Sequence, residues 1–588
     1  MFEHELDQAN QAILKELERQ EITPPDEATW APTPFHGLWG FGTAICFQAA
    51  ANEARQGQKI NVPQRAQAIA ESALPALNNL GLFEQVAAER GYINVYFKQS
   101  EYAQRVIDTV LAQGAKFGQA EPTGQRVMVE YSQPNTHKAF HVGHLRNTIL
   151  GSSVANILEA AGHDVVRANY LGDIGWHVIK WLWCYLKFHA GEEPQGDPTR
   201  WMDAIYQEAA RLVEENPEYE AEARQIFSRW DQGDEELEAL WSKTRQWSLE
   251  GFQEIYTWLK ADFDVLFFES DVEEPGKKLV EEMIERGLAV DERPEGGAVV
   301  TKLDELLGLD KETYRVLVIL RSDGTSLYAS KDLPLAVMKF EQYNLDRSIY
   351  VIDVRQSLYL RQIFKTLELL GYEWAKDCIH LSYEIVNLPG NVTMSSREGT
   401  VVLFDDLRSE AVERAEAIVL EKNPELGPDL RRQVGTQVAL GAIKYPMLSV
   451  DNNKVATFDW ERALDFEGQA APYIQYAHVR ANSILKRAGE FPASMTPEYA
   501  LEPQEVQLLE KLAQFPGEVQ RSAEELKPLI LANYAYELAK VFTSFYQNCQ
   551  VIKAEPAVQA NRLRLTSAAK QTLANALNLL GIPAPEVM

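Results

Sequence analysis

Cysteine is scarce in this sequence: the 588 residues include only four, Cys46, Cys184, Cys378 and Cys549. No two of them form a CxxC pair, so neither a disulfide framework nor a structural zinc site is expected, and a reducing cytoplasm fits. A run of about 18 or more apolar residues, which a membrane-spanning helix needs, is also missing. Residues 1–20 are acidic, polar and helix-patterned, unlike a secretion or transit signal. We therefore expect a cytoplasmic protein with no membrane partner and no tightly bound metal.

Positive charge is in short supply as well. The chain carries 86 acidic and 57 basic side chains, a formal net charge of −29, whereas nucleic-acid binding normally requires Lys and Arg to neutralise phosphates. The deficit is uneven, because residues 201–260 hold 14 acidic and 6 basic side chains but residues 471–588 hold 11 of each. A neutral C-terminal segment permits a nucleic-acid surface there, and the acidic run is expected to be a solvated helical face.

One stretch of the sequence predicts a βαβ unit. A β-rich run at Arg126–Ser132 is followed by a loop that ends at His144. A helical pattern then runs from Leu145 to a C-cap at Gly162, and an apolar strand follows at Asp164–Leu171. Strand, loop, helix and strand at this spacing predict a parallel sheet with helices on its faces.

The pattern along the whole chain predicts three domains. Residues 1–120 read as a small α+β domain, residues 121–405 as a Rossmann-type α/β domain with an insertion at about 180–310, and residues 406–588 as an all-α bundle. The insertion begins with an acidic helical stretch whose tryptophans are expected to form its core. These tryptophans are Trp201, Trp230, Trp241, Trp247 and Trp258. Strand-like runs resume at residues 316–320, 348–353 and 379–388.

The most specific motif is His141-Val142-Gly143-His144, in the loop between the first strand of the βαβ unit and its helix. Ligands of an open parallel sheet bind beyond the carboxyl ends of its strands, where a helix N-terminus offers unpaired N–H groups to phosphates. Gly143 lets a nucleotide approach the backbone, and the two imidazoles can donate to phosphate oxygens as charge develops. The alternative is a pair of surface histidines at the start of a helix.

A second polar loop, Met394-Ser395-Ser396-Arg397-Glu398-Gly399-Thr400, lies between two apolar runs. Together with HVGH it resembles the second signature, KMSKS, of the class I aminoacyl-tRNA synthetases, whose first signature is HIGH. Thr393 and Ser396 stand where lysines are usual in that signature. The chemistry needs one mobile ammonium beside the ATP phosphates, and Lys138 occupies the place of a lysine that many arginyl enzymes carry just upstream of HIGH. The alternative is that Lys138 is merely solvated.

The extended first motif, Glu130–Thr148, and several later blocks in the same order resemble the arginyl-tRNA synthetases. The later blocks are Asn169–Gly175, Arg321–Leu333, Ile352–Leu358, Ala442–Tyr445, Phe458–Trp460 and Phe466–Ala477. In and just after the first of them, Ile174, Trp176 and His177 depart from the commonest form. The resemblance implies a monomeric arginine–tRNA ligase whose partners are ATP with Mg²⁺, L-arginine and arginine tRNA. It also implies an anticodon-binding C-terminal bundle, an N-terminal domain that contacts the tRNA elbow, and arginine activation that requires bound tRNA.

The resemblance also implies roles for single residues in the reaction. No side chain is needed as a covalent nucleophile, because positioning and charge stabilisation carry the rate. The residues expected to act catalytically are His141, His144, Lys138 and Arg397. The residues expected to bind ATP are His141, Gly143, His144, Met394, Ser395 and Ser396.

The residues also suit arginine as the amino acid substrate. A guanidinium needs planar carboxylate or amide acceptors, and an acceptor that bonds it with two parallel hydrogen bonds selects arginine over lysine. Tyr328 and Asp332 are four residues apart and share one face of a helix, so Asp332 can accept the guanidinium while Tyr328 packs on it or hydrogen-bonds it. Glu130 can hold the guanidinium from the other side or bind the ammonium of the substrate. By resemblance the arginine-binding residues are Glu130, Ser132, Asn135, His144, Tyr328, Asp332 and Gln356. The alternative for Tyr328 and Asp332 is an exposed helix face.

Two sets of residues are expected to bind tRNA. Tyr92 and Asn94 alternate on a strand and face the same side, which suits stacking on and reading of bases. The C-terminal segment combines aromatic residues, for stacking on unpaired bases, with basic ones that hold phosphates. The aromatics are Tyr473, Tyr476, Tyr534 and Tyr536, and the basic residues include Arg480, Lys486, Arg487, Lys540, Arg562 and Arg564.

Three other interpretations remain. Another class I synthetase is disfavoured by the carboxylates at Glu130 and Asp332 and by the missing KMSKS lysine. A small-molecule nucleotidyltransferase that shares HxGH has no use for a long helical C-terminal domain. A tRNA-binding paralogue without activity is disfavoured by the intact motifs.

Overall fold

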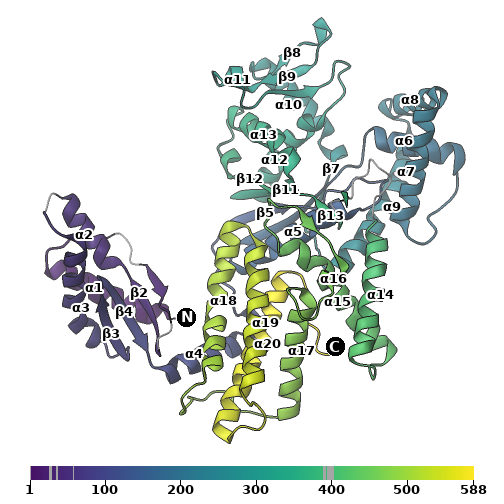
Figure 1. Ribbon diagram of the computed structural model, residues 1–588. Coiled ribbons are helices and arrows are strands. Elements are labelled where there is room, and N and C mark those ends of the chain that lie inside the picture. Colours follow the sequence, from purple (N-terminus) through teal and green to yellow (C-terminus); the bar gives the residue numbers. More distant parts are fainter. Residues whose placement is uncertain (1, 26–28, 35–36, 57–58, 389–391, 394–402) are drawn as a thin grey trace. The chain divides into compact units, whose positions relative to one another are not determined.

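The chain divides into two compact units, and Figure 1 shows the computed structural model. The structure describes residues 2–588 apart from 26–28, 35–36, 57–58, 389–391 and 394–402. The first unit comprises residues 1–117, 481–514 and 540–572, and the second comprises residues 118–480, 515–539 and 573–588. None of the helices among the described residues is both long and apolar enough to cross a membrane.

The N-terminal part of the first unit is an antiparallel sheet with three helices packed on one face (Figure 1). Alternation in the strand sequence explains the packing, because Ile93 and Val95 are fully buried against the helices while Asn94, between them, faces the other way. The strands, in spatial order, are β1 (Trp30–Pro32), β2 (Trp39–Thr43), β4 (Tyr92–Phe97) and β3 (Gln85–Glu89). The helices are α1 (Glu3–Arg19), α2 (Ile45–Arg55) and α3 (Val62–Asn78), and the chain continues into α4 (Gln99–Gln113) and η1 (Gly114–Lys116).

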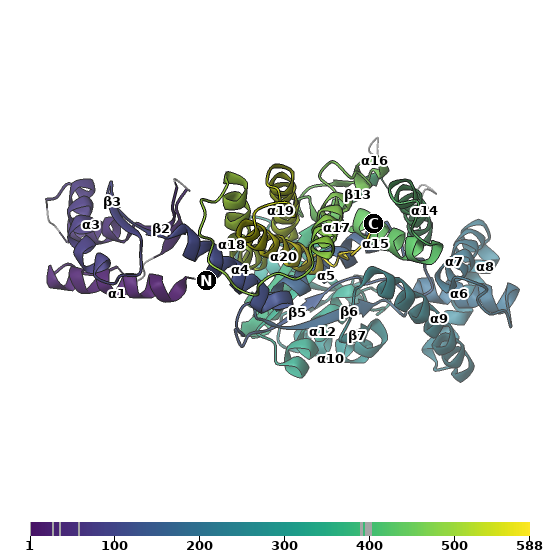
Figure 2. The same ribbon diagram turned by 90° about the horizontal axis from the view of Figure 1, so that it is seen from below.

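The second unit is built on a five-stranded sheet whose neighbouring strands all pair in parallel, as the βαβ pattern predicts. Its strands, in spatial order, are β12 (Cys378–Tyr383), β11 (Arg347–Asp353), β5 (Arg126–Glu130), β6 (Asp164–Leu171) and β7 (Val265–Phe268). Figure 2 shows helices α5 (Val142–Ala160) and α12 (Tyr328–Tyr343) on opposite faces of this sheet. The α/β fold class is therefore confirmed. The order also places β5, which comes first along the chain among the strands of this sheet, between β6 and β11, which is a topological switch point.

Helix α5 begins earlier than the sequence pattern predicts, at Val142 and not at Leu145. The reason is a capping box, in which the His141 side chain accepts from the backbone of the first turn and the His144 side chain accepts from the backbone of His141. Capping of this kind satisfies N–H groups that have no partner within the helix. The two histidines of the motif therefore start the helix instead of ending the loop before it.

The helices between β6 and β7 form their own small core. They are α6 (Trp176–Phe188), α7 (Pro198–Glu215), α8 (Pro217–Asp231) and α9 (Glu235–Leu259). Trp181 and Trp183 are buried in this core, and four of the expected tryptophans pack on it. Trp258 does not belong to it, because its ring lies 5.5 Å from that of Phe404.

The prediction of the strands that follow the inserted helices was partly wrong. The sequence reading missed β7, which returns the chain to the main sheet, because a strand of four residues after a long helical stretch gives a weak periodic signal. The run at 316–320 is β10 (Val316–Leu320), but it belongs to a separate sheet with β9 (Val299–Lys302) and β8 (Val290–Asp291). This sheet is accompanied by η2 (Glu269–Val272), α10 (Glu273–Glu285), η3 (Arg293–Glu295) and α11 (Leu303–Leu306).

The run at 379–388 is two strands, because β13 (Val386–Leu388) leaves the main sheet and joins β14 (Val392–Thr393) and β15 (Ala456–Thr457). Between β11 and β12 lie η4 (Val354–Gln356), α13 (Ser357–Leu369) and η5 (Glu373–Asp377). The described part of the chain after β14 is mostly helical, as expected. Its helices are α14 (Phe404–Lys422), α15 (Pro428–Leu448), α16 (Trp460–Ala463), α17 (Ala471–Ala488), α18 (Pro503–Glu525), α19 (Pro528–Asn548) and α20 (Pro556–Leu579).

Candidate functional site

A cavity of about 310 Å³ lies at the carboxyl ends of the parallel strands, on the face covered by α12 and α13. This is the edge of an open parallel sheet at which ligands bind. The cavity brings together most of the residues expected to hold arginine, from β5, the following loop, α12 and the end of η4. They are Glu130, Asn135, Tyr328, Asp332 and Gln356.

Helix α12 contributes a single stripe to the cavity. Tyr328, Asp332, Leu335 and Lys339 all line it, and spacings of four, three and four residues put them on one helix face. Tyr328 is 69% exposed, whereas the side chain of Lys339 is only 1% exposed, so the stripe runs from solvent into the protein. The face shared by Tyr328 and Asp332 is thus the wall of a cavity.

Lysines neutralise two of the three carboxylates that line the cavity. Lys339 donates to one oxygen of Glu130, and the amide of Gln133 donates to the other at 2.8 Å. Lys331 forms an ion pair with Glu269, in which the nitrogen and oxygen are 2.9 Å apart. Both oxygens of Glu130 therefore already have partners from within the protein.

Asp332 differs from these two carboxylates. Among the described residues that line the cavity, none forms an ion pair with it, and its partner is the hydroxyl of Tyr359, which donates at 2.5 Å. Burial raises the pKa of Asp332 to about 7, the Tyr359 hydrogen bond opposes the shift, and the charges of Glu130 and Glu269 add to it. The cavity thus holds a carboxylate whose ionised form would gain strongly from a cation.

Ser132 and His144 do not line this cavity. The hydroxyl of Ser132 is buried 2.8 Å from that of Tyr256, and its backbone N–H donates to Asn147 at 2.7 Å. The ring of His144 is stacked on that of His141, with centroids 3.9 Å apart. In this structure both residues support the loop between β5 and α5, and neither lines the space that could hold a guanidinium.

That loop contains residues in the left-handed backbone region, which is uncommon for residues other than glycine. Ser132 has φ +78°, Gln133 +52° and His137 +63°. The N–H group of Gln133 donates to Asn169 at 2.9 Å, and that of His137 donates to Ser248 at 2.9 Å. Strained residues held by several different elements are typical of binding sites, where the strain presets the geometry.

The capping box fixes how the two motif histidines can act. Nδ1 of His141 accepts from the N–H of Gly143 at 3.1 Å, and Nδ1 of His144 accepts from the N–H of His141 at 3.5 Å. Since each Nδ1 is an acceptor, the proton of each neutral ring must be on Nε2, which can donate to a ligand. Burial lowers the pKa of His141 to about 4, helped by Lys138, and burial likewise holds the pKa of His144 well below its ordinary value. Both rings are therefore neutral at pH 7.

Lys138 supplies the positive charge beside these rings. Burial lowers its pKa, and Asp203 opposes that shift. Its ammonium lies 4.6 Å from the centre of the Tyr206 ring and close enough to both histidines to lower their pKa values. Lys138 is therefore partly buried beside the motif and does not extend freely into solvent.

The residues of the second signature fall outside the described part of the chain. This concerns Met394, Ser395, Ser396 and Arg397, so the structure gives no geometry for their expected roles.

The two residues expected to contact tRNA on β4 differ in exposure. Tyr92 is 46% exposed at the start of the strand, whereas Asn94 is 9% exposed and its amide lies 3.4 Å from a carboxylate oxygen of Glu89. An amide engaged in this way is a poor candidate for direct base reading. Tyr92 has the open ring that stacking needs.

Helix α17 presents one stripe of partly exposed residues, Tyr473, Tyr476 and Arg480, within a run that is otherwise buried. The guanidinium of Arg480 donates to the hydroxyl of Tyr476 at 2.5 Å and lies 5.3 Å from the centre of its ring. This places aromatic and basic groups together on a surface, as binding of a single-stranded loop requires.

Three residues of the expected C-terminal surface are buried, which corrects the sequence interpretation. Arg562 pairs with Glu505 at 3.1 Å, and Arg564 pairs with Asp108. Tyr534 is only 2% exposed. Helical periodicity could not reveal this, because the acidic partners are distant in sequence.

Sequence reasoning also missed several residues that line the cavity. They are Gln133, Tyr170, Glu269, Lys339 and Tyr359. A signal did exist for Lys339, which is seven residues after Asp332 and therefore shares its helix face. Tyr359 and Glu269 come from other elements, so only the fold brings them to the cavity.

Comparison with known proteins identifies two family models along the chain. Residues 106–460 match the model described as tRNA synthetases class I (R), catalytic domain, and residues 474–588 match the DALR anticodon binding domain. An arginine–tRNA ligase of Clostridium acetobutylicum is 35% identical over 523 residues, covering 89% of this chain and 91% of that protein. One of Treponema denticola is 37% identical, covering 84% and 85%. The solved arginyl-tRNA synthetase of Thermus thermophilus aligns with a TM-score of 0.78 and 29% identity, covering 98% and 99%.

Proposed function

Because the chain belongs to the class I arginyl-tRNA synthetases and joins arginine to arginine tRNA, we propose that the cavity at the carboxyl ends of the strands is its arginine site. The observation that carries this proposal is Asp332. The lysines neutralise Glu130 and Glu269 but leave Asp332 without a cationic partner among the described cavity residues. A guanidinium supplies the missing charge.

Selection of arginine over lysine follows from the shape of the acceptors. Asp332 offers a planar carboxylate that a guanidinium can meet with two parallel N–H groups, whereas an ammonium is a point donor. Tyr359 donates to one lone pair of an Asp332 oxygen and so orients the carboxylate, while the other lone pair of that oxygen can accept from the guanidinium. Tyr328, at the open end of the stripe, packs on the plane of the guanidinium or hydrogen-bonds it.

Glu130 then acts by a route other than direct contact with the guanidinium. Because Lys339 and Gln133 already use both of its oxygens, Glu130 sets the position of the loop and of the buried ammonium. Asn135 and Gln356, which also line the cavity, remain free to contact the polar end of the amino acid.

The family uses ATP, and we propose that its phosphates bind at the N-terminus of α5. The Nε2–H groups of His141 and His144 donate to phosphate oxygens, and the helix N-terminus and Lys138 supply positive potential. Mg²⁺, when bound, would neutralise further phosphate charge. The described groups beside this helix end are imidazoles, the ammonium of Lys138 and the Asp203 carboxylate, which already accepts from the N–H of Ala139, so the ion would be held mainly by ATP and water.

The reaction needs no covalent enzyme intermediate. A carboxylate oxygen of arginine forms a bond to the α-phosphorus of ATP, and the bond from that phosphorus to pyrophosphate breaks. In the second step the 2′-hydroxyl of the terminal adenosine bonds to the arginyl carbonyl carbon, AMP leaves, and the hydroxyl proton is released. The protein contributes orientation through α12 and charge stabilisation through the start of α5.

Arginine tRNA is proposed to contact the stripe Tyr473, Tyr476 and Arg480 with its anticodon loop and Tyr92 with its elbow. The DALR match over residues 474–588 supports the first contact. We further propose that the enzyme is a cytoplasmic monomer and that bound tRNA is required before arginine is activated.

Pyrophosphate exchange into ATP tests the proposal. A panel of amino acids is assayed with and without arginine tRNA, and exchange is expected with arginine alone and only when tRNA is present. Exchange with lysine at a comparable rate would refute the site assignment, and exchange without tRNA would refute the tRNA requirement.

A further inference from the structure

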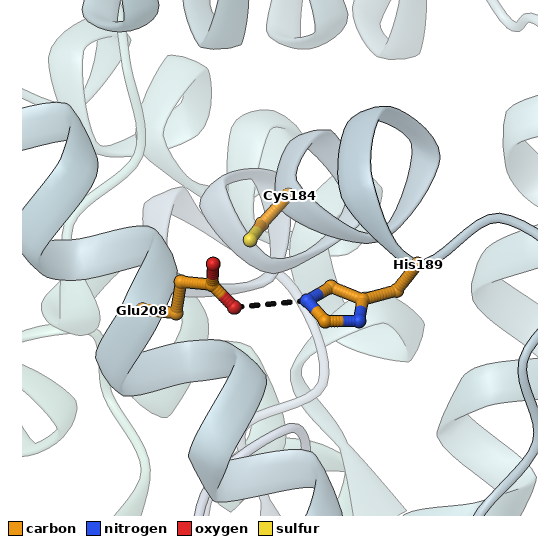
Figure 3. A group of neighbouring side chains, drawn as sticks. All are labelled: Cys184, His189 and Glu208. Atoms are coloured by element: carbon orange, nitrogen blue, oxygen red, sulfur yellow. Dashed lines mark hydrogen bonds and ion pairs between the residues drawn. The ribbon is translucent and has the colours of Figure 1, made fainter.

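A cluster of metal-ligand side chains lies in the inserted helices and has no part in the reaction derived above (Figure 3). Cys184 is on α6, His189 follows the last residue of that helix, and Glu208 is on α7. One donor atom from each of the three lies within 4.8 Å of the other two. The sulfur of Cys184, the ring of His189 and the carboxylate of Glu208 point toward one another in Figure 3.

A fourth residue orients the histidine. Nε2 of His189 lies 2.8 Å from Glu208, and Nδ1 lies 3.0 Å from a carboxylate oxygen of Glu192. The turn that carries Glu192 is fixed by Tyr185, whose hydroxyl donates to the Glu192 carbonyl at 2.8 Å. A carboxylate on the far nitrogen of an imidazole is the usual outer support of a metal-bound histidine, because it sets the ring orientation and the tautomer.

We propose that Cys184, His189 and Glu208 form a binding site for a divalent transition metal ion of the Zn²⁺ class. A thiolate sulfur, an imidazole nitrogen and a carboxylate oxygen together suit a borderline-soft ion and do not suit Mg²⁺ or Ca²⁺, which prefer oxygen donors alone. On binding, the sulfur forms a bond to the metal and its proton passes to solvent. Three protein donors leave one tetrahedral position for water.

The donor atoms must move before they can share one ion: separations of up to 4.8 Å must close, and the shortest one must widen. Metal–ligand bonds of about 2.0–2.3 Å place tetrahedral donor atoms roughly 3.3–3.6 Å apart. The separation of 2.8 Å between His189 and Glu208 must therefore widen by about half an ångström, as the metal replaces the hydrogen bond between them. Glu208 and His189 are partly exposed, so both side chains have room to move and the ion has a path from solvent.

A bound ion would hold the end of α6 against α7. Cys184 is fully buried in the tryptophan-rich core of the insertion, while His189 and Glu208 lie at its edge. The site would thus add a second link between the core and the turn that the Tyr185 hydroxyl already holds. Cysteine spacing gave no hint of it, because its donors come from two helices and contain no CxxC pair.

Cobalt substitution tests the proposal on the full-length protein. After treatment with a chelator, the protein is titrated with Co²⁺, and a near-ultraviolet charge-transfer band reports a thiolate bound to the metal. We expect one equivalent of Co²⁺ to produce this band and Zn²⁺ to abolish it. Cys184→Ala and His189→Asn are expected to lose the band and to weaken binding at least tenfold.

Matched variants separate the site from general effects. Cys46→Ala removes another fully buried cysteine, and Glu214→Gln removes an exposed carboxylate from the same helix α7; both are expected to keep the band. Melting curves with and without Zn²⁺ provide a second measurement, in which the wild type gains stability and Cys184→Ala does not. A wild type that shows neither the band nor a Zn²⁺-dependent shift would overturn the proposal, and so would a band that survives Cys184→Ala.

Discussion

Lys339 and Glu130 form an ion pair in which the two side chains are 1% and 3% exposed, at the inner end of the cavity. The ammonium also lies 4.5 Å from the centre of the Tyr350 ring. A buried charge is expensive unless it is paired, so each partner requires the other. Because Glu130 uses the charge of Lys339, Asp332 has no ion-pair partner among the described cavity residues and can accept a cation from a ligand.

Replacement of Lys339 by Met should destabilise the protein by about 3–5 kcal/mol, because Glu130 would be left buried without its cation. Urea unfolding measures this change. Lys339→Arg keeps the charge and should lose much less stability. The double variant Glu130→Gln/Lys339→Met should recover most of the loss, and a double-variant loss equal to the sum of the losses of Lys339→Met and Glu130→Gln would show that the pair is not coupled.

Arginine binding should depend on pH through Asp332. Its pKa of about 7 in the free protein means that the carboxylate is protonated at lower pH. Since a guanidinium needs the ionised form, arginine affinity should be highest above about pH 8 and fall up to tenfold per unit below pH 7. Calorimetric titrations between pH 5.5 and pH 8.5 measure this, and a flat profile would contradict the role of Asp332.

The same shift has a consequence for stability, with the opposite sign from that of an ordinary ion-paired aspartate. The folded pKa is raised above 3.8, the ordinary value, so folding is favoured by protonation and loses stability as pH rises toward and through 7. Asp332→Asn cannot ionise and avoids this cost. The variant should therefore gain on the order of 2 kcal/mol relative to wild type at pH 8, and much less at pH 4. A gain in stability together with a loss of arginine binding would show that Asp332 serves function and not stability.

Much of the fold could be predicted from the sequence, because the βαβ unit depends on local periodicity. The spacing of Tyr328 and Asp332 likewise predicted one helix face. What the sequence could not give were contacts between distant elements. Lys339 meets Glu130 across 209 residues, and Tyr359 meets Asp332 from another helix.

Burial of charge was the main source of error in the C-terminal segment. Arg562 and Arg564 were expected to hold tRNA phosphates at the surface, because nothing in their helical pattern distinguishes them from surface residues. Their partners, Glu505 and Asp108, lie 57 and 456 residues away, and only the tertiary structure brings those carboxylates to them.

Lys138→Ala should lower the rate of arginine activation by well over tenfold with little loss of stability. In the described part of the chain Lys138 places an ammonium beside His141 and His144. Thr393 and Ser396 stand at the usual lysine positions of the second signature and carry no positive charge. Lys180→Ala is the matched control, since Lys180 also lies over the Tyr206 ring, at 5.5 Å. Adding Ser396→Lys to the Lys138→Ala variant should restore part of the activity. A wild-type rate of pyrophosphate exchange in Lys138→Ala would show that Lys138 does not replace the missing KMSKS lysine.

Arg480→Glu should weaken tRNA binding at least tenfold while leaving arginine and ATP binding unchanged, because Arg480 belongs to the proposed tRNA surface and does not line the arginine cavity. Arg521→Glu, at another surface arginine with a side chain 55% exposed, is the control. Gel-shift titrations compare the two. A point variant is preferable to removal of the whole C-terminal segment, since removal would also take away Leu579, whose carbonyl accepts from Ser153 at 3.3 Å. Equal tRNA affinity in both variants would exclude the stripe from the tRNA surface.

The central claim is that Asp332 receives the guanidinium of arginine, and calorimetric titration of Asp332→Asn tests it most directly. The isosteric change keeps an acceptor for Tyr359 but removes the charge. Wild type and variant are titrated with arginine and, separately, with ATP, in the presence of arginine tRNA at pH 8. The account predicts that arginine binding weakens by about 2–5 kcal/mol while ATP binding is unchanged. Arginine affinity equal to that of the wild type would contradict it.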